Sequence, residues 1–178
     1  YVSAVSRPIA DAFARRYGTS APVLVHNCHP WREREALTPR APRDRRGPAL
    51  SLYWYSQTVG LDRGIQDAIR AAGLLSAPPQ IHLRGSVAPD VRATLTALAR
   101  EFGGGPSLFF HEPCDPSELL AYAVEHDVGL ALEFDGTVNR SLTATNKIFL
   151  YLTAGLAIAA TDVAGQRSIL ETCEDAGG

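Results

Sequence analysis

Long apolar runs and closely spaced cysteines are missing from this sequence, and each absence narrows the class of protein. No stretch of about 18 apolar residues occurs, so no membrane-spanning helix is predicted, and the N-terminus lacks the features of a signal peptide. The three cysteines, Cys28, Cys114 and Cys173, are far apart and odd in number. This pattern argues against a disulfide framework and favours a reducing cytoplasm.

Methionine is absent altogether, and the first residues are typical of the last turns of a helix. We therefore expect residues 1–178 to be one domain cut from a longer protein, with sequence missing upstream and also downstream. The composition is that of a globular domain, with 46% hydrophobic and 20% charged residues. A formal net charge of -2 gives no broad basic field for nucleic acid, so any anion is bound locally.

Three common motifs of α/β enzymes are also missing. The sequence contains no Gly-x-Ser-x-Gly elbow, no Walker-type phosphate loop and no Gly-x-Gly-x-x-Gly. What it does contain, from residue 50 onward, is a regular alternation of short apolar runs and amphipathic stretches. The predicted strands cover residues 50–55, 80–84, 107–110, 128–132 and 156–160. The predicted helices cover residues 61–72, 91–102, a segment capped by Asp115, 146–154 and 164–171.

This alternation predicts a Rossmann-like α/β domain with a mostly parallel sheet and helices on both faces. Upstream, a helix over residues 9–17 and a short strand over 22–26 precede it. Ligands of such sheets bind beyond the carboxyl ends of the strands. The loops of interest are therefore residues 56–63, 85–89, 111–115 and 133–147.

The most informative segment is 139–155, which begins as a loop and continues as a helix. A helix N-terminus offers free N–H groups and a positive dipole end, both of which suit phosphate. Lys147 is the only lysine among 17 Lys and Arg residues and begins this helix, beside Thr145, Asn146 and the nearby Arg140. Two plainer interpretations stay open, in which Lys147 is a solvated surface lysine and Asn146 is a helix cap.

Three further groups of residues are candidates for ligand binding. Arg63 opens the first crossover helix, where a guanidinium meets a helix N-terminus, although a surface arginine fits the pattern as well. Glu133 and Asp135 follow the fourth predicted strand and are candidates for sugar hydroxyls, with plain loop carboxylates as the alternative. His111 and Glu112, followed by a proline, are candidates for shaping a nucleobase pocket, with an ordinary strand-to-helix loop as the alternative.

Residues 26–47 carry two features of weaker meaning. The run from His26 to Pro30 contains two histidines and a cysteine, but no further ligands are spaced to complete a zinc site, so no metal is expected. The simpler interpretation is that this run is a loop at the edge of the ligand-binding cleft. Residues 30–47 are rich in arginine and proline without an apolar period and are predicted to form a flexible loop. Peripheral contact of this loop with an anionic membrane or an acceptor stays open.

Several segments together resemble the C-terminal domain of the family-4 group of retaining glycosyltransferases, which have the two-domain GT-B architecture. Val-Ser-Arg-Pro-Ile-Ala at residues 5–10 is similar to the family's Val-Ser-x-x-Ile-Ala, and Arg63-Gly64 lies where the family has Lys-Gly. The most specific likeness is Asn-Lys-Ile-Phe-Leu-Tyr-Leu-Thr-Ala-Gly at residues 146–155, similar to Asn-Lys-x-Phe-Glu-Tyr-Leu-x-Ala-Gly.

The resemblance implies that this domain holds a nucleoside-diphosphate sugar, with Arg63 and Lys147 stabilising the departing diphosphate without a metal ion or other cofactor. The acceptor is unknown, and the N-terminal domain that binds it is absent from the sequence. Two positions depart from the family. Thr58 replaces an arginine, and Leu150 replaces the glutamate that commonly binds ribose, while Arg140 is a candidate to restore the lost positive charge.

The sequence therefore predicts the donor-binding half of an enzyme that transfers a hexose-type sugar, with a fragment that is inactive by itself. Two alternatives stay open. One is a non-catalytic binding or interaction domain of the same fold, suggested by the departures at Thr58 and Leu150. The other is a GT-B-like epimerase that acts on the sugar nucleotide itself.

Overall fold

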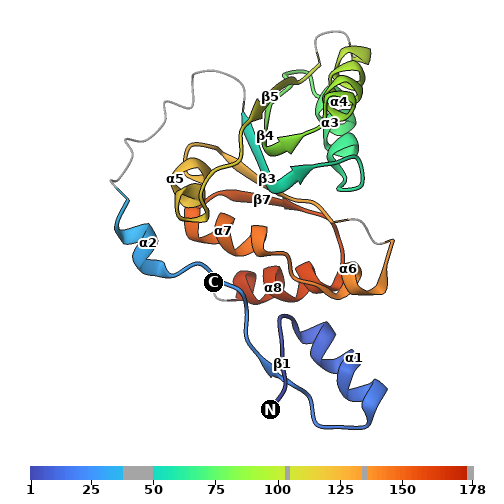
Figure 1. Ribbon diagram of the computed structural model, residues 1–178, viewed down its shortest axis with the longest axis vertical. Helices are drawn as coiled ribbons and strands as arrows, with labels where there is room; N and C mark the ends of the chain where they lie inside the picture. Colours follow the sequence, from blue (N-terminus) through green and yellow to red (C-terminus); the bar gives the residue numbers. More distant parts are fainter. Residues whose placement is uncertain (38–49, 103–104, 134–135, 176–178) are drawn as a thin grey trace.

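Five parallel strands form the centre of the computed structural model, which describes residues 1–37, 50–102, 105–133 and 136–175 (Figure 1). The sheet has the strand order β5-β4-β3-β6-β7, and every neighbouring pair is parallel. The strands are β3 (Ser51–Val59), β4 (Gln80–Val87), β5 (Ser107–His111), β6 (Val128–Ala131) and β7 (Ala157–Ala160). The α/β class and the parallel sheet predicted from the sequence are confirmed.

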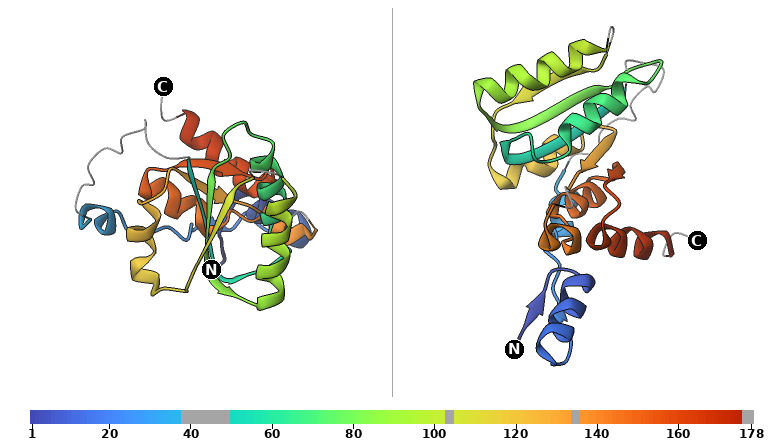
Figure 2. Two further views of the ribbon diagram at one scale, coloured as in Figure 1. Left: turned by 90° about the horizontal axis from the view of Figure 1, so that it is seen from above. Right: turned by 90° about the vertical axis from the view of Figure 1, so that its right-hand side faces the viewer.

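Helices cover both faces of this sheet (Figure 2). Side chains on consecutive strand residues point to opposite faces, and the fully buried neighbours Tyr53 and Trp54 accordingly belong to two different hydrophobic clusters. Trp54 packs with α3 (Ile65–Gly73) and α4 (Pro89–Glu101), which cover one face. The Tyr53 cluster includes residues of the helices on the other side, namely α5 (Leu119–Ala123), α7 (Asn146–Ala154) and α8 (Ala164–Asp175).

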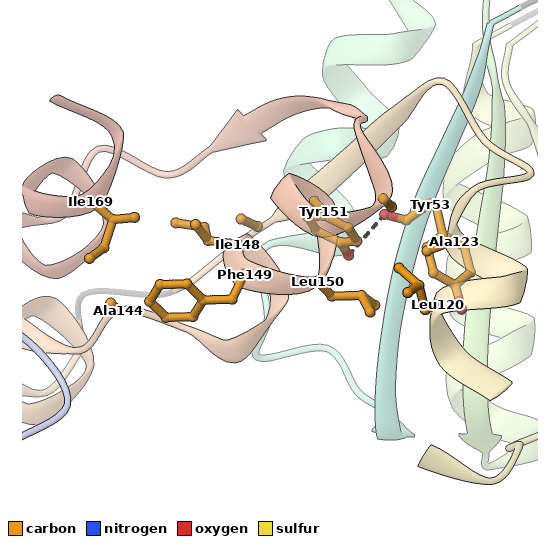
Figure 3. Packing of buried hydrophobic residues seen from close by; sticks show 11 residues of the cluster. Tyr53, Leu120, Ala123, Ala144, Ile148, Phe149, Leu150, Tyr151 and Ile169 are labelled. Carbon is orange, nitrogen blue, oxygen red and sulfur yellow. Dashed lines mark hydrogen bonds between the residues drawn. The ribbon is translucent and has the colours of Figure 1, made fainter. Parts of the chain in front are cut away.

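The helix α7 is attached to the sheet through Tyr151, whose side chain is completely buried (Figure 3). The Tyr151 hydroxyl donates to the backbone oxygen of Tyr53 at 3.1 Å and lies 3.3 Å from that of Leu130. Gly129 of β6 makes this approach sterically feasible, because a Cβ atom there would overlap the Tyr151 ring. The height of α7 above β3 and β6 is therefore fixed by a ring that lies against a glycine.

Local end signals in the sequence correspond to the observed helix boundaries. The helix α1 (Arg7–Tyr17) is capped by Ser6, whose Oγ accepts from the Ile9 amide at 3.4 Å, and is followed by Gly18 at φ 64°. At Asp115 both hydrogen bonds of a capping box form, and the 3₁₀ turn η1 (Pro116–Glu118) leads into α5. Gly155, at φ 73°, ends α7 as predicted.

The N-terminal segment lies apart from the central sheet. Its strands β1 (Ser3–Ala4) and β2 (Val23–Leu24) form a two-stranded parallel sheet, so the expectation of helical turns at the start of the chain is wrong. The helix α1 packs against α8 and α6 (Val138–Leu142), at the opposite end of the molecule from α4 (Figure 1). The Ser6 hydroxyl donates to the backbone oxygen of Leu142 at 2.6 Å, which ties the two segments together.

Three connections differ from the sequence prediction. The predicted loop at residues 30–47 contains the short helix α2 (Trp31–Glu35), and its residues 38–47 lie outside the described part of the chain. The strands β3 and β4 continue past their predicted ends, with an irregular register between Tyr55 and Thr58. Gly85, at φ 143°, lies against the Ser56 carbonyl, where a Cβ atom would collide with it. Among the described residues, no helix is long and apolar enough to cross a membrane.

Candidate functional site

A cavity of about 720 Å³ opens at the carboxyl ends of the central strands. The chain runs from β3 outward to β4 and β5 and then returns to β6 on the other side of β3, which makes the β3–β6 boundary the switch point of the sheet. Ligands of doubly wound sheets bind at this point. The cavity wall there includes Tyr55 of β3, Glu133 after β6 and the first turn of α7.

Arg63, Glu133 and Lys147 form the charged centre of this cavity. Glu133 lies between the two cations, with one carboxylate oxygen 3.9 Å from Arg63 Nη1 and the other 3.9 Å from Lys147 Nζ. These separations are ion-pair distances and are too long for hydrogen bonds. The two cations therefore converge on one carboxylate without being tightly bound to it.

Lys147 is a buried cation, with 8% of its surface exposed. Burial lowers the pKa of its ammonium group, Glu133 raises it and the neighbouring Arg63 lowers it further. Its Nζ atom lies 5.3 Å from the ring centre of Trp54 and 5.8 Å from that of Tyr55. A cation in the first turn of a helix also opposes the helix dipole. The stability of α7 alone therefore does not explain this lysine.

The N-terminus of α7 is open toward the cavity. Thr145 occupies the N-cap position but makes no side-chain capping hydrogen bond, and both Thr145 and Asn146 line the cavity wall. The interpretation of Asn146 as the cap is therefore wrong by one residue, because Asn146 is already helical. Since the first N–H groups of a helix have no partner within it, this turn presents donors to the cavity.

Arg63 precedes the other helix that points at the cavity. Gly64 caps α3 in the left-handed conformation, at φ 73°, so the chain turns sharply after Arg63. The Nε atom of Arg63 also lies 3.8 Å from Oδ1 of Asp62. Asp62 in turn accepts hydrogen bonds of 3.3 Å from Arg140 of α6, at its backbone oxygen and at Oδ2. The hydrogen bond from Arg140 is the main cause that lowers the pKa of Asp62. Arg140 does not line the cavity wall, and its contact to phosphate stays a prediction.

The segment after β5 is divided between the cavity and a neighbouring cluster of aromatic rings. His111 stacks on His82 and forms a ring-to-ring hydrogen bond of 2.9 Å with it, and burial lowers the pKa of His111. Glu112 contributes its backbone oxygen to Arg84 and leaves its side chain exposed. Pro113 and Cys114 line the cavity. The nucleobase role predicted for this segment stays a prediction.

Leu150 and Thr58, the two departures from the family pattern, both lie away from the cavity wall. Leu150 is fully buried in the cluster of Tyr53, beside Leu120 (Figure 3). Thr58 is exposed near the end of β3. Asp135, the second carboxylate proposed for sugar binding, lies outside the described residues.

Arg84 is a cavity residue that the sequence pattern did not predict. It is the fifth residue of β4, 8% exposed, and it lines the cavity. No signal in the sequence marked this residue, because Arg84 falls in the polar phase of the alternation, together with Gln80 and His82. The run around Cys28 and His29 also borders the cavity, as expected for an edge of the cleft, and no group of three ligands suited to a metal forms among the described residues.

Comparisons with known proteins were informative for the fold. No protein-family model and no curated protein match the sequence. The structure is similar to the apo form of the lipopolysaccharide outer core galactosyltransferase WaaB, with a TM-score of 0.64 and 17% identity. It is also similar to the trehalose-6-phosphate synthase OtsA, with a TM-score of 0.57 and 14% identity. At these identities the similarity establishes the fold, a Rossmann-like half of the GT-B architecture.

The alignments cover most of this chain and less than half of each neighbour. They include 90% of this chain and 43% of the WaaB chain, and 88% of this chain and 40% of the OtsA chain. The described fold therefore corresponds to one part of each of these larger proteins.

Proposed function

We propose that this chain binds the diphosphate of a nucleoside-diphosphate sugar in the cavity and supplies the donor site of a glycosyltransferase. The observation that carries the proposal is the convergence of Arg63 and Lys147 on Glu133 at the switch point of the sheet. Arg63 follows β3, whereas Glu133 follows β6 and Lys147 lies in the first turn of α7, and the fold brings their charges into one cavity.

The charge balance of this centre favours an anionic ligand. Two cations face one carboxylate, and the first turn of α7 adds uncapped N–H donors. Lys147 bears a desolvation penalty that Glu133 offsets only in part, since the pKa of Lys147 remains lowered. A diphosphate supplies the missing negative charge and accepts hydrogen bonds from both cations and from the helix.

Sugar transfer from such a donor requires stabilisation of the departing diphosphate. Its negative charge increases as the glycosidic bond breaks, so fixed cations beside it lower the barrier more than they strengthen donor binding. Arg63 and Lys147 have this role in the proposal, Glu133 accepts hydrogen bonds from sugar hydroxyls, and no cofactor other than the donor is needed. The names of the two structural neighbours, a galactosyltransferase and a trehalose-6-phosphate synthase, support sugar transfer. A retaining outcome and a cytoplasmic setting are further parts of the proposal.

Calorimetric titration of the chain with UDP, GDP and ADP tests this assignment. Lys147→Ala and Arg63→Ala are each expected to lower the affinity of the nucleotide that binds by about 10- to 100-fold, since charged hydrogen bonds contribute roughly 1.5–3 kcal/mol. Arg15→Ala, on the exposed side of α1, removes the same charge away from the cavity and is the matched control. An equal loss in all three variants contradicts the site.

A non-catalytic binding domain is the second candidate, and the position of Leu150 favours it. In the glycosyltransferase family that the sequence resembles, this position is a ribose-binding glutamate, whereas here a leucine lies fully buried in the core. If calorimetry detects no nucleotide binding to the unaltered chain, and the titrations of Lys147→Ala do not differ from it, the donor site is refuted and this second candidate stands.

A further inference from the structure

A second buried cation, Arg84, lies at the other end of the same cavity and is held by three different elements. Its Nε donates to the Tyr53 hydroxyl at 3.1 Å, and its Nη1 donates to the backbone oxygen of Glu112 at 2.8 Å. The guanidinium carbon lies 3.8 Å from the ring centre of Tyr122 on α5. These contacts fix the plane of the guanidinium before any ligand arrives.

Within the described parts of the chain, Arg84 takes part in no ion pair with a carboxylate. The Tyr53 phenol and the Glu112 carbonyl engage two of its five N–H donors, and the thiol of Cys114 is a further, weaker partner. All three partners are neutral. A buried cation with only neutral partners retains the capacity to bind another acceptor strongly. Because Arg84 lines the cavity wall, this acceptor would come from the ligand.

The two ends of the cavity differ in polarity. The segment after β5, which holds Arg84, contributes the apolar or weakly polar side chains of Pro113, Cys114, Pro116 and Leu119, and Ser56 and Gln57 of β3 add the polar groups beside it. At the other end, Glu133, Thr145 and Asn146 accompany the cation pair. A flat, largely apolar nucleobase suits the first environment, whereas a sugar rich in hydroxyl groups requires the carboxylate and amide of the second.

The separation of the two ends fits the length of a nucleoside diphosphate. Arg84 lies on β4, Glu133 follows β6, and β3 lies between these strands. Neighbouring strands are about 4.8 Å apart, so two strand spacings correspond to about 10 Å. A nucleotide with its diphosphate at Arg63 and Lys147 therefore reaches Arg84 with its base.

We propose that Arg84 is a specificity-determining residue that selects a keto nucleobase, one with a carbonyl oxygen where adenine and cytosine carry an amine. This inference rests on the proposed donor site. Arginine only donates hydrogen bonds, so it pairs with O6 of a 6-oxopurine or O4 of uracil, whereas an exocyclic amine presents a second donor to it. An amino base would leave a buried N–H donor of Arg84 without an acceptor, and a site of this kind strongly rejects such a ligand.

The test uses two pairs of ligands that differ in the exocyclic group of the base, keto or amino, and in the adjacent ring nitrogen, which carries a hydrogen only in the keto member. Inosine diphosphate is compared with ADP, and UDP is compared with CDP, by calorimetry on the unaltered chain. At least one keto member is expected to bind about 10-fold or more tightly than its amino counterpart, equivalent to about 1.4 kcal/mol. Equal affinity within both pairs, or a preference for the amine, overturns the inference while the donor site stands.

The variant Arg84→Gln tests whether Arg84 causes the preference for the keto base. Glutamine both donates and accepts, so the difference within the preferred pair should fall to less than about 3-fold. Tyr53→Phe removes one acceptor of Arg84 but leaves the guanidinium in place, and it should retain the preference. If Arg84→Gln loses affinity equally for all four ligands, Arg84 contacts the phosphates and base selection is overturned. If the variant keeps the full difference within the preferred pair, base selection by Arg84 is overturned as well. If no nucleotide binds the unaltered chain, both this inference and the donor site are refuted.

Discussion

Two hollows of similar size border the same sheet, and their side chains differ sharply. The cavity at the carboxyl ends of the strands, about 720 Å³, contains three buried or half-buried cations and one carboxylate. The second hollow, about 640 Å³, is an apolar groove beside α3 whose wall includes Leu52, Ala68, Leu75, Leu130 and Val163. Volume therefore does not distinguish the two hollows, whereas the gathering of several cations does, because it occurs only in the first.

The largest expected effect concerns the packing of α7 into the hydrophobic core. Leu150→Ala should lower the free energy of unfolding by about 2–5 kcal/mol, because it opens a void in the cluster of Tyr53. Urea denaturation of the chain measures this loss. Leu152→Ala in the same helix is the matched control, since Leu152 is 38% exposed. Equal losses in the two variants contradict the packing described for α7.

The next effect distinguishes a buried ammonium from an ordinary surface lysine. Because the pKa of Lys147 is lowered from 10.5, it loses its charge at a lower pH than a free lysine, and diphosphate affinity should fall as the pH rises through that range. Arginine stays charged there. The ratio of the affinities of Lys147→Arg and the unaltered chain for one nucleoside diphosphate, measured from pH 7 upward, should therefore increase, and the ligand's own titration cancels in this ratio. A constant ratio contradicts the lowered pKa.

A smaller effect is expected where charge is exposed at the cavity rim. Asp62→Asn removes the partner of Arg140 and a neighbour of Arg63, and an exposed ion pair contributes only about 0–1 kcal/mol. Nucleotide affinity should change by less than about 5-fold. Asp67→Asn, which breaks the exposed pair with Arg70, is the control for charge removal. A change as large as that of Lys147→Ala in calorimetry would place Asp62 among the ligand-binding residues.

The smallest effect belongs to the apolar groove. Leu75 is 54% exposed, so Leu75→Ser should alter the free energy of unfolding by no more than about 0.5 kcal/mol. Nucleotide affinity should remain within experimental error, because the two further carboxylates of the groove, Asp67 and Asp162, are already paired with arginines on the surface. A marked loss of affinity, measured by the same titrations, would show that the two hollows are coupled.

The fold was predictable because its signals are local. Alternating apolar runs marked all five strands of the central sheet, and Asp115, Gly18 and Gly155 marked helix ends that the structure shows. The short helix α2 was missed because a single turn has no apolar period to detect. The continuation of β3 past Tyr55 was missed because it depends on pairing with β4 across a register shift.

The site was predictable only in part. Arg63, Glu133 and Lys147 each follow a strand or begin a helix, and parallel topology alone predicts that such positions meet at one edge. Arg84 was missed because it lies within a strand, where an arginine is expected to be exposed. Its burial depends on the Tyr53 hydroxyl and on the Tyr122 ring of α5, contacts that arise from tertiary packing and leave no mark on the local pattern.

Gly129 shows how a residue remote from ligand chemistry controls the site. With no side chain of its own, it lets the Tyr151 ring lie against β6 and carry its hydroxyl to backbone oxygens of β3 and β6. Lys147 lies one turn earlier in the same helix, so the spacing between this lysine and Arg63 depends on the thickness of the layer between helix and sheet. The absence of a side chain at Gly129 thereby helps to set the distance between the two cations.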